Sequence, residues 1–477
     1  MKVLLINPPM EDMIMSDSPM FLDEERGYNP PLGLLYLSSY AIEHSKHHIE
    51  ILDSQVEEMD YKDIGNKIED FMPDIVGIQA MTFTLMDVIK TAEIVKKINP
   101  GIKVILGGPH ANIFPYETIN LSCVDYVILG EGEHAFTDLL NNIGSLDNTS
   151  SQDKLREIKG IVFKDSNGNA VNTGARDFIE NLDMLPFPAR KLTPHQKYTS
   201  LLAKRSPVTT MITSRGCPYK CTYCDRPHLG KMFRARSAKN VVDEMEECVG
   251  MGIKEFLIYD DTFTIDRQRV IDICDEICRR KLDIGWDIRA RVNTVDKEML
   301  LKLRKAGCER IHYGVEASDQ KVLDNLGKGI TLKQVKDAFR WTKQAKIETL
   351  AYFMIGSPGE GREEILKTID FAKQLKPDFV SFSVTTPFPE TELYKMALEK
   401  GIIKTDVWKE FAENPSKDFR APLWTENLTR DELMELLMYA YKNFYTRPGY
   451  IIKKLMNVRS IPELKRKVKA GLRMFRL

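Results

Sequence analysis

Two stretches of the chain alternate short apolar runs with helical segments, and this alternation constrains the fold more than any other feature. In residues 1–145 the runs are rich in Val, Ile and Leu, as are strands that helices cover on both faces. Consecutive strand–helix units predict an α/β fold with a doubly wound parallel sheet, Rossmann-like in topology. The predicted strands are 2–7, 48–53, 74–80, 102–107 and 124–129.

The alternation returns in residues 206–400, and it predicts a central partial (β/α)6 barrel. Such a barrel carries its chemistry on loops at the carboxyl ends of the strands. Residues 146–205 are rich in Ser, Asn and Pro and are expected to form a linker with a small hairpin around Asn167–Gly168. Residues 401–477 are expected to be helical. The barrel strands are predicted at 209–214, 254–260, 284–290, 309–315, 348–355 and 378–385.

The composition narrows the class of protein. A length of 477 residues corresponds to about three domains, and 43% hydrophobic with 29% charged residues is typical of soluble globular proteins. The 68 basic and 69 acidic side chains nearly cancel, which argues against a nucleic-acid-binding protein. No apolar run approaches the roughly 18 residues of a membrane span. Eight cysteines in so long a chain indicate a reducing, cytoplasmic location.

A cysteine motif follows the first predicted strand of the barrel: Arg215-Gly-Cys-Pro-Tyr-Lys-Cys-Thr-Tyr-Cys224. Its spacing is Cys-x3-Cys-x2-Cys, formed by Cys217, Cys221 and Cys224, on a loop at the carboxyl end of that strand. Three thiolates can bind three irons of a four-iron (4Fe-4S) cluster and leave the fourth iron open to another ligand. Arg215 is expected near the negative charge of the cluster.

Two other interpretations of the motif are weaker. Core cysteines have no packing reason to gather on a polar Gly-Pro loop. A closed zinc site formed by the three cysteines and His228 is a second alternative, but structural zinc usually stabilises small domains that lack a core. An open coordination site at the mouth of a barrel accounts better for the motif.

Cys-x3-Cys-x2-Cys on the first loop of a partial barrel resembles the radical S-adenosylmethionine (SAM) superfamily. Segments 259–263, 313–317, 353–360 and 386–390, all at predicted strand ends, agree with it. The resemblance spans residues 206–400. It implies that the open iron binds the amino and carboxylate groups of SAM, and that one-electron reduction cleaves SAM to methionine and a 5′-deoxyadenosyl radical. An external electron donor of flavodoxin or ferredoxin type is expected with this chemistry.

The resemblance also implies contacts between individual residues and SAM. Tyr223, just before the last cysteine, matches an aromatic position beside the adenine. Glu316 matches an acidic position near the ribose, and Gly356 matches a glycine position near the adenine. These three residues are therefore the expected SAM-binding residues of the barrel.

Charged residues at two other strand ends are candidates for catalysis. Asp260 and Asp261 are expected to face SAM or the substrate, with a surface loop or helix cap as the alternative. Arg289 and Arg291 alternate at the end of the third barrel strand. One of them is expected to bind a carboxylate and the other to form a solvated ion pair; Arg289 is the candidate for the site.

The first block ends its strands in segments that suit a large ligand. Asn7-Pro-Pro ends the first strand, and Gly107-Gly-Pro-His110 and Gly130-Glu-Gly-Glu133 end the fourth and fifth. Glycines there let the backbone approach a ligand or simply turn. Placed before a radical SAM barrel, residues 1–145 resemble the cobalamin-binding domain of a large class of these enzymes. The residues expected at cobalamin are Asn7, Gly107, Gly108, Gly130, Glu131 and Gly132.

One departure from that domain concerns cobalt. Many cobalamin-binding domains carry a histidine after the first strand that ligates cobalt from below, and residues 7–29 here contain none. The cobalt is then expected to have an open or water-occupied lower face, unless the domain has lost cobalamin. His110 and His134 are expected to be loop or cap residues rather than cobalt ligands.

The carboxyl-terminal tail is strongly basic. Residues 451–477 hold nine Lys or Arg and one Glu, interleaved with apolar residues in a basic amphipathic pattern. Residues 443–454 resemble a tail in the subgroup that includes the anaerobic magnesium-protoporphyrin cyclase and hopanoid-associated proteins. The resemblance implies a larger, often hydrophobic or membrane-derived (lipid-like) substrate, and the basic amphipathic pattern predicts a peripheral contact with an anionic membrane. The alternative is a helix docked on the barrel with a solvated basic face.

These features together predict a cobalamin-dependent radical SAM enzyme that acts on a small-molecule or lipid-like substrate. The predicted reaction is methylation of an unactivated carbon. A radical cyclisation, rearrangement or coupling without methyl transfer is the alternative reaction. From another class of protein, a non-catalytic cobalamin-binding sensor or carrier with a structural cluster is the second alternative.

Overall fold

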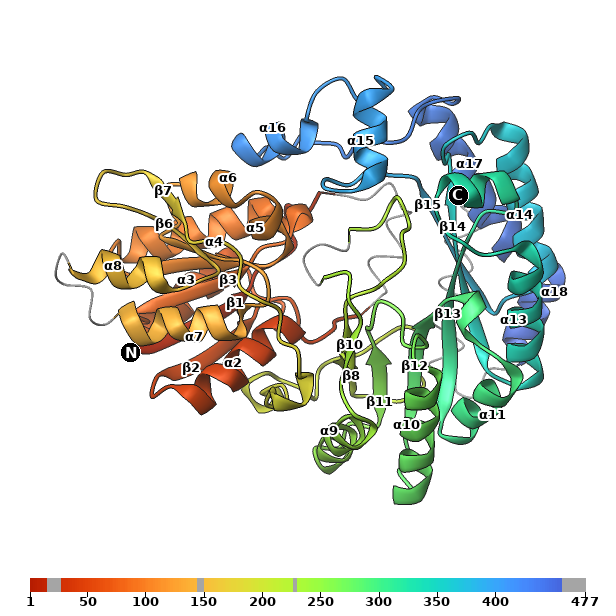
Figure 1. Ribbon diagram of the computed structural model, residues 1–477, viewed down its shortest axis with the longest axis horizontal. Helices are drawn as coiled ribbons and strands as arrows, with labels where there is room; N and C mark the ends of the chain where they lie inside the picture. Colours follow the sequence, from red (N-terminus) through yellow and green to blue (C-terminus); the bar gives the residue numbers. More distant parts are fainter. Residues whose placement is uncertain (15–26, 144–149, 226–229, 457–477) are drawn as a thin grey trace.

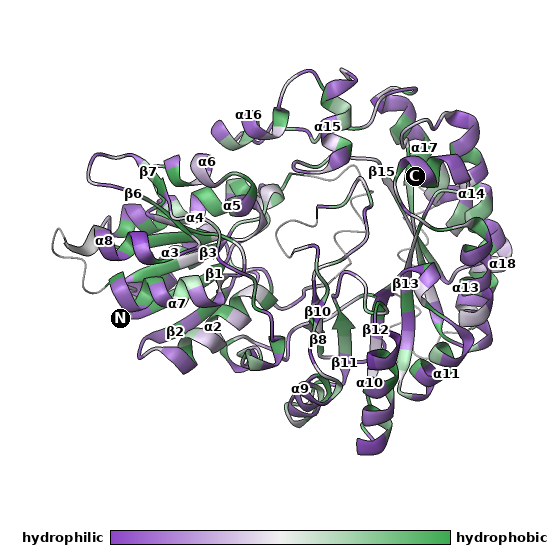
Figure 2. Cartoon of the chain, in the orientation of Figure 1, coloured by the Kyte–Doolittle hydropathy of each residue, from purple (hydrophilic) through white to green (hydrophobic). Residues whose placement is uncertain are grey.

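The computed structural model describes residues 1–14, 27–143, 150–225 and 230–456. It contains two parallel sheets flanked by helices, followed by helical segments at the carboxyl end of the chain (Figure 1). Apolar residues concentrate in the strands and on the helix faces that pack against them, while the outer helix faces are hydrophilic (Figure 2). The α/β fold class predicted from the sequence is confirmed.

The N-terminal sheet has the strand order β2-β1-β3-β4-β5-β6-β7. The first five of these strands run parallel, and the hairpin β6–β7 extends the sheet in the antiparallel sense. The hairpin expected in the linker therefore forms, and it pairs with β5. The strands are β1 (Lys2–Asn7), β2 (His48–Asp53), β3 (Ile75–Gln79), β4 (Lys103–Gly107), β5 (Tyr126–Ile128), β6 (Ile161–Lys164) and β7 (Ala170–Asn172).

Helices cover both faces of this sheet, because alternate residues of each strand enter two separate cores. Val3 and Leu5 of β1 pack with α2 (Leu32–His44) and α7 (Gly132–Ile143). Leu4 and Ile6 pack on the other face, with α3 and α4. The remaining elements of this half are α3 (Tyr61–Phe71), η1 (Thr82–Thr84), α4 (Leu85–Ile98), α5 (Pro109–Ile113), α6 (Pro115–Asn120), α8 (Ser150–Glu157), η2 (Leu182–Met184) and η3 (Arg190–Leu192).

The second sheet is wholly parallel, with the order β15-β14-β13-β12-β11-β8. Its two edge strands do not pair with each other, so the barrel is open, as predicted. The strands are β8 (Val208–Met211), β11 (Glu255–Ile258), β12 (Gly285–Ala290), β13 (Cys308–Glu316), β14 (Glu348–Ile355) and β15 (Phe379–Val384). The helices between them are α9 (Ala238–Gly250), α10 (Arg267–Arg280), η4 (Val292–Thr294), α11 (Lys297–Lys305), α12 (Gln320–Asn325), α13 (Leu332–Gln344) and α14 (Arg362–Leu375).

The predicted strand 209–214 is interrupted. After β8 the chain leaves the barrel sheet, because the amide of Thr213 donates to Asp260 Oδ1 over 2.6 Å instead of to a neighbouring strand. Ser214–Arg215 then forms β9, which pairs antiparallel with β10 (Arg234–Ala235). This two-stranded ladder closes the base of the loop that carries the three cysteines.

Helices α15 (Glu392–Glu399), α16 (Val407–Glu413), α17 (Arg430–Tyr445) and α18 (Pro448–Met456) complete the described chain. Helix α17 covers the edge strand β15: the hydroxyls of Tyr441 and Tyr445 donate to the carbonyls of Phe382 and Val380 at 2.8 and 2.7 Å and accept from their amides. Such contacts occupy backbone groups that an edge strand would otherwise expose. Helix α16 packs against α6 of the N-terminal half (Figure 1).

Candidate functional site

The cysteine loop is anchored at its start by a buried carboxylate. Asp260, at the end of β11, accepts the amide and hydroxyl of Thr213 and the hydroxyl of Ser214, each at 2.6 Å. Its exposed fraction is 1%. Arg269 adds a second anchor, since it donates to the carbonyls of Thr213 and Arg236. These contacts favour a structural role for Asp260, and its predicted catalytic role stays a prediction.

The three cysteines lie on this loop with unequal exposure: Cys221 is buried, Cys217 is half-buried and Cys224 is exposed. Gly216 precedes them with a positive φ of 85°, a conformation that favours glycine. Further along, the amide of Thr222 donates to Leu326, and the amide of Leu393 donates to the carbonyl of Thr222 at 2.8 Å. The loop is therefore held by the end of α12 and by α15 as well as at its base.

The donor set fits an iron–sulfur cluster. Within the described ranges no three His, Cys, Asp or Glu side chains gather closely enough to hold a single metal ion. A four-iron cluster does not require such closeness, because each thiolate binds a different iron. The zinc alternative also involves His228, which lies outside the described residues.

Arg291 contributes to the site in a way that the sequence did not predict. Its guanidinium donates to Cys221 Sγ over 3.3 Å and lies 3.8 Å from the ring centre of Tyr219. It is buried and makes no ion pair among the described side chains. The expected solvated ion pair at this position is therefore wrong. A buried cation here would lie beside the negative charge of a bound cluster.

The predicted SAM-binding residues Tyr223 and Glu316 form a hydrogen bond with each other. Tyr223 donates from its hydroxyl to Glu316 Oε1 at 3.0 Å, and Lys328 Nζ lies 2.6 Å from the same oxygen. Burial, followed by the charge of Glu316, raises the pKa of Tyr223 well above its usual value. A Cβ at Gly314 would lie 2.4 Å from Glu316 Oε1 and would displace this ion pair. A neutral tyrosine and an ion-paired glutamate at a strand end fit the polar groups of SAM.

The other predicted barrel residues occupy different positions. Gly356 has a φ of 70°, and a Cβ there would lie 2.5 Å from Leu433 Cδ2, so packing against α17 alone accounts for glycine. Asp261 is exposed, and its charge raises the pKa of Cys217, although burial is the larger cause. Arg289 is half-buried and lies 3.9 Å from the ring centre of Tyr259. Their contacts with SAM or substrate stay predictions.

The predicted cobalamin residues lie together at the carboxyl edge of the N-terminal sheet. In parallel α/β sheets this edge binds ligands. A Cβ at Gly108, which has a φ of 112°, would lie 2.9 Å from the carbonyl oxygen of Ala80, and a Cβ at Gly130 would meet no atom within 4 Å. Gly107 ends β4 and Gly132 begins α7. Without side chains at these glycines, the backbone leaves room for a large flat ligand.

Asn7 and Glu131 have other partners at this edge. Asn7 Nδ2 donates to Asp53 Oδ1 over 2.7 Å, and Glu131 is ion-paired with two arginines of the barrel half. Nearby, Asn29 donates to the hydroxyl of Tyr259, while its buried Oδ1 has no hydrogen-bond partner in the described chain. An unmatched buried acceptor between the two halves suits a donor on a ligand.

The two histidines near this edge, His110 and His134, have different surroundings. His110 is fully buried, its Nδ1 lies 3.2 Å from the hydroxyl of Thr82, and burial lowers its pKa to about 4. His134 packs against the ring of Tyr40, with centres 4.9 Å apart. That neither side chain ligates cobalt stays a prediction, and the buried Nε2 of His110 has no hydrogen-bond partner in the described chain.

Four charged side chains connect the two halves of the site. Arg215, two residues before Cys217, pairs with Glu131 at 2.9 Å and with Glu133 at 2.5 Å. Arg234 pairs with Glu131 at 2.9 Å. Arg215 was expected beside the cluster, but its guanidinium nitrogens bind these carboxylates instead. We call Glu131, Glu133, Arg215 and Arg234 the interdomain ion-pair network.

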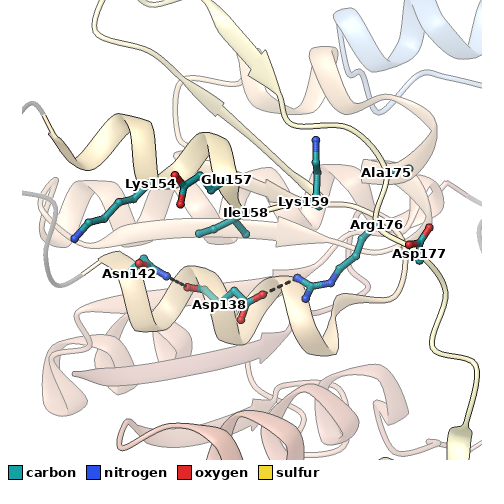
Figure 3. A pocket seen from close by; sticks show the side chains of 9 residues that line it. All are labelled: Asp138, Asn142, Lys154, Glu157, Ile158, Lys159, Ala175, Arg176 and Asp177. Carbon is teal, nitrogen blue, oxygen red and sulfur yellow. Dashed lines mark hydrogen bonds and ion pairs between the residues drawn. The ribbon is translucent and has the colours of Figure 1, made fainter.

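A surface hollow of about 570 Å³ lies elsewhere, beside α7 and α8 (Figure 3). Its lining is mostly charged and includes the ion pair between Arg176 and Asp138 at 2.6 Å. None of the predicted site residues lines it. This hollow is therefore separate from the candidate site.

Two family models match the chain: the radical SAM superfamily over residues 211–372 and the B12 binding domain over residues 22–140. An uncharacterised methyltransferase of Pyrococcus horikoshii is 35% identical over 100% of this chain and 99% of its own length. The anaerobic magnesium-protoporphyrin IX monomethyl ester cyclase of Rubrivivax gelatinosus is 28% identical over 90% of this chain and 76% of its own length.

Solved structures share the fold. The cobalamin-dependent SAM radical enzyme OxsB, with aqua-cobalamin and SAM bound, superposes with a TM-score of 0.74 at 20% identity, over 100% of this chain and 71% of its own. The radical SAM methyltransferase TsrM of Kitasatospora setae gives a TM-score of 0.69 at 19% identity, over 84% of this chain and 76% of its own.

Proposed function

Because the chain belongs to the cobalamin-dependent radical SAM enzymes, we propose that it transfers a methyl group from SAM to an unactivated carbon of a small-molecule substrate. Its cofactors are a 4Fe-4S cluster, SAM and cobalamin. The observation that carries the proposal is the full-length similarity to an uncharacterised methyltransferase of Pyrococcus horikoshii. In support, the interdomain ion-pair network brings the cysteine loop to the edge of the N-terminal sheet.

Together these cofactors supply radical formation from SAM and methyl-group carriage, and the chain supplies binding and orientation. Cys217, Cys221 and Cys224 would hold the cluster, with Arg291 stabilising the Cys221 thiolate. Tyr223 and Glu316 would orient the adenosyl group of SAM. The glycine-rich ends of β4 and β5 would leave room for cobalamin against the strand ends. The substrate would then lie between the two sheets' carboxyl edges.

Product analysis tests methyl transfer. The protein is reconstituted anaerobically with iron, sulfide and cobalamin, then reduced in the presence of SAM and substrate. Methyl transfer consumes two SAM per product, one giving S-adenosylhomocysteine and the other 5′-deoxyadenosine. Formation of both compounds in equal amounts supports the proposal, and Cys217→Ala protein serves as the blank.

A second reaction has its own support in the cyclase of Rubrivivax gelatinosus. A radical cyclisation, rearrangement or coupling without methyl transfer would release 5′-deoxyadenosine without matching S-adenosylhomocysteine. The same product analysis therefore separates the two reactions. Absence of SAM cleavage under strong reductant would favour the sensor or carrier alternative.

The reaction needs an external electron donor, and we assign this role to a carrier of flavodoxin or ferredoxin type. In support, Cys224 is the exposed one of the three cysteines, and the carrier would approach the cluster from its side of the loop. Lys220 and Lys231 are exposed on the same loop and suit an acidic carrier. Reduction of the cluster by such a carrier should slow as salt concentration rises.

A peripheral membrane contact would suit a lipid-like substrate and a cytoplasmic enzyme. Among the described helices none is long and apolar enough to cross a bilayer. At the start of the basic tail, Lys453 pairs with Asp378 at 2.9 Å and Lys454 lies over the ring of Phe379, so these two cations contact the barrel. Residues 457–477 lie outside the described chain. Flotation with anionic and neutral liposomes, with and without residues 457–477, tests the contact.

A further inference from the structure

The interdomain ion-pair network is buried and fully matched in charge. The side chains of Arg215 and Arg234 are 7% and 6% exposed, and those of Glu131 and Glu133 are 3% and 6% exposed. Burial alone would raise the pKa of Glu131, but Arg234 and Arg215 lower it below its usual value. Removing one member of such a group leaves an unpaired charge in a dry environment, which is strongly unfavourable. The network therefore holds its elements in one arrangement.

On the barrel side the network closes the base of the cysteine loop. Arg215 and Arg234 lie directly opposite each other in the β9–β10 ladder. Like charges opposite each other in a ladder repel, and Glu131 removes this repulsion by pairing with both arginines. Since Arg215 is two residues before Cys217, its position sets where the loop enters the site.

On the other side the network fixes the segment that follows β5. Glu131 and Glu133 flank Gly132, the first residue of α7, where negative charge is favourable for a helix. Glu131 Oε2 also accepts the amide of Ile179 over 2.7 Å. Arg215 uses Nη1 for Glu131 and Nη2 for Glu133, and two contacts from one planar group fix both distance and orientation.

We propose that Glu131 and Glu133 are positioning residues that set the separation between the cluster and cobalamin by binding Arg215 at the base of the cysteine loop. This inference rests on the proposed function, and it gives the Gly130-Glu-Gly-Glu133 segment a role distinct from contacting cobalamin. Cluster and cobalamin bind on opposite sides of the network, so each stabilises the arrangement that the other requires. Binding of one is therefore coupled to binding of the other, and such coupling is reciprocal.

The chain offers a matched control. Glu244 is fully buried between Arg190, at 2.6 Å, and Arg236, in a second glutamate–arginine network. That network does not touch the segment after β5, and its one contact with the N-terminal half is between Arg236 and the hydroxyl of Tyr36 in α2, at 3.4 Å, among the described residues. Glu244→Gln should therefore disturb stability about as much as Glu133→Gln while leaving the separation of the two cofactors unchanged.

The test uses full-length protein reconstituted with cluster and cobalamin. Electron paramagnetic resonance measures how a reduced cluster accelerates relaxation of the Co(II) signal, an effect that depends steeply on their separation. Wild type and Glu244→Gln should show the same acceleration, and Glu133→Gln a smaller and heterogeneous one. In parallel, cobalamin should bind cluster-loaded wild type about tenfold more tightly than cluster-free protein, and Glu133→Gln should lose this difference. Arg215→Lys, which cannot bridge both carboxylates, should behave as Glu133→Gln.

The outcomes separate this inference from the proposed function. Unchanged relaxation and unchanged coupling in folded Glu133→Gln overturn the inference alone. Failure of the wild-type protein to retain cobalamin would overturn both the inference and the proposed function. If Glu133→Gln does not fold, Glu133→Asp, which keeps the charge on a shorter side chain, is measured in its place with the same expectation.

Discussion

The guanidinium of Arg291 donates to the Sγ atom of Cys221 over 3.3 Å, from the end of β12 to the cysteine loop. Arg291 also donates to the carbonyl of Lys328 and stacks on Tyr219, so its orientation is fixed independently of the cysteine. A fixed, buried cation beside one cluster ligand favours the more negative, reduced cluster.

Arg291→Ala should therefore make the midpoint potential of the cluster more negative and lower the iron content of reconstituted protein. A redox titration followed by electron paramagnetic resonance, with iron and sulfide analysis, measures both effects. Arg291→Lys should recover part of the potential, because it keeps the charge. Arg267→Ala, which removes an exposed ion pair with Asp296 and Glu298, is the control. Equal potentials in all four proteins would contradict this role.

Replacing Cys217, Cys221 or Cys224 by alanine should abolish SAM cleavage, because each thiolate binds a different iron of the cluster. Formation of 5′-deoxyadenosine under strong reductant measures the effect. Cys278→Ser, on α10 and outside the loop, should retain cleavage. Zinc instead of iron after anaerobic purification, or an active Cys221→Ala protein, would refute the cluster assignment.

Asp260→Asn should destabilise the protein by about 1–3 kcal/mol, because one of its oxygens becomes an amide donor facing the hydroxyl or amide donors of Thr213 and Ser214. Thermal unfolding measures the loss, and iron retention should fall with it. The KM for SAM of the surviving holoenzyme should stay close to the wild-type value. An unchanged melting temperature with a raised KM would instead support a direct contact with SAM.

The Co(II) form of bound cobalamin should show no nitrogen superhyperfine splitting from a protein ligand. The reason is that residues 7–29 contain no histidine and that His110 is fully buried against Thr82. Electron paramagnetic resonance at low temperature decides the point. A nitrogen splitting that disappears in His110→Ala or His134→Ala protein would show that one of these side chains ligates cobalt.

Ionisation of the buried Glu360 should lower the free energy of unfolding as pH rises. Burial raises the pKa of Glu360 to about 7, and its Oε1 has no partner in the described chain. The folded state therefore binds this proton more tightly than the unfolded state, in which the usual value of 4.5 applies. The stabilising contribution is present below the unfolded pKa and is lost as pH rises to about 7.

Glu360→Gln mimics the protonated carboxyl and should remove this pH dependence. The variant should melt at the same temperature as wild type near pH 4.5, and at a higher temperature than wild type above about pH 7. Melting curves recorded between about pH 4.5 and pH 7 measure the difference in melting temperature between the two proteins. Glu399→Gln, at an exposed glutamate of α15, is the control, and parallel curves for wild type and Glu360→Gln would contradict the assignment.

Much of the fold follows from local patterns. Runs of Val, Ile and Leu separated by helical periodicity predicted the parallel strands of both sheets, because strand and helix burial repeat at different periods along the chain. The predicted strand 209–214 is divided because Asp260, 47 residues away in sequence, takes the amide of Thr213.

The sequence by itself determined the order of strands and helices, the cysteine spacing and the glycine-rich strand ends, since each depends on neighbours along the chain. Only the tertiary structure decided that Arg215 pairs with Glu131 and Glu133, that Arg291 contacts Cys221 rather than solvent, and that two tyrosines of α17 cover β15. A buried charge or polar group is stable only beside a partner. Its partner depends on how distant segments pack, and a local sequence pattern cannot predict that partner.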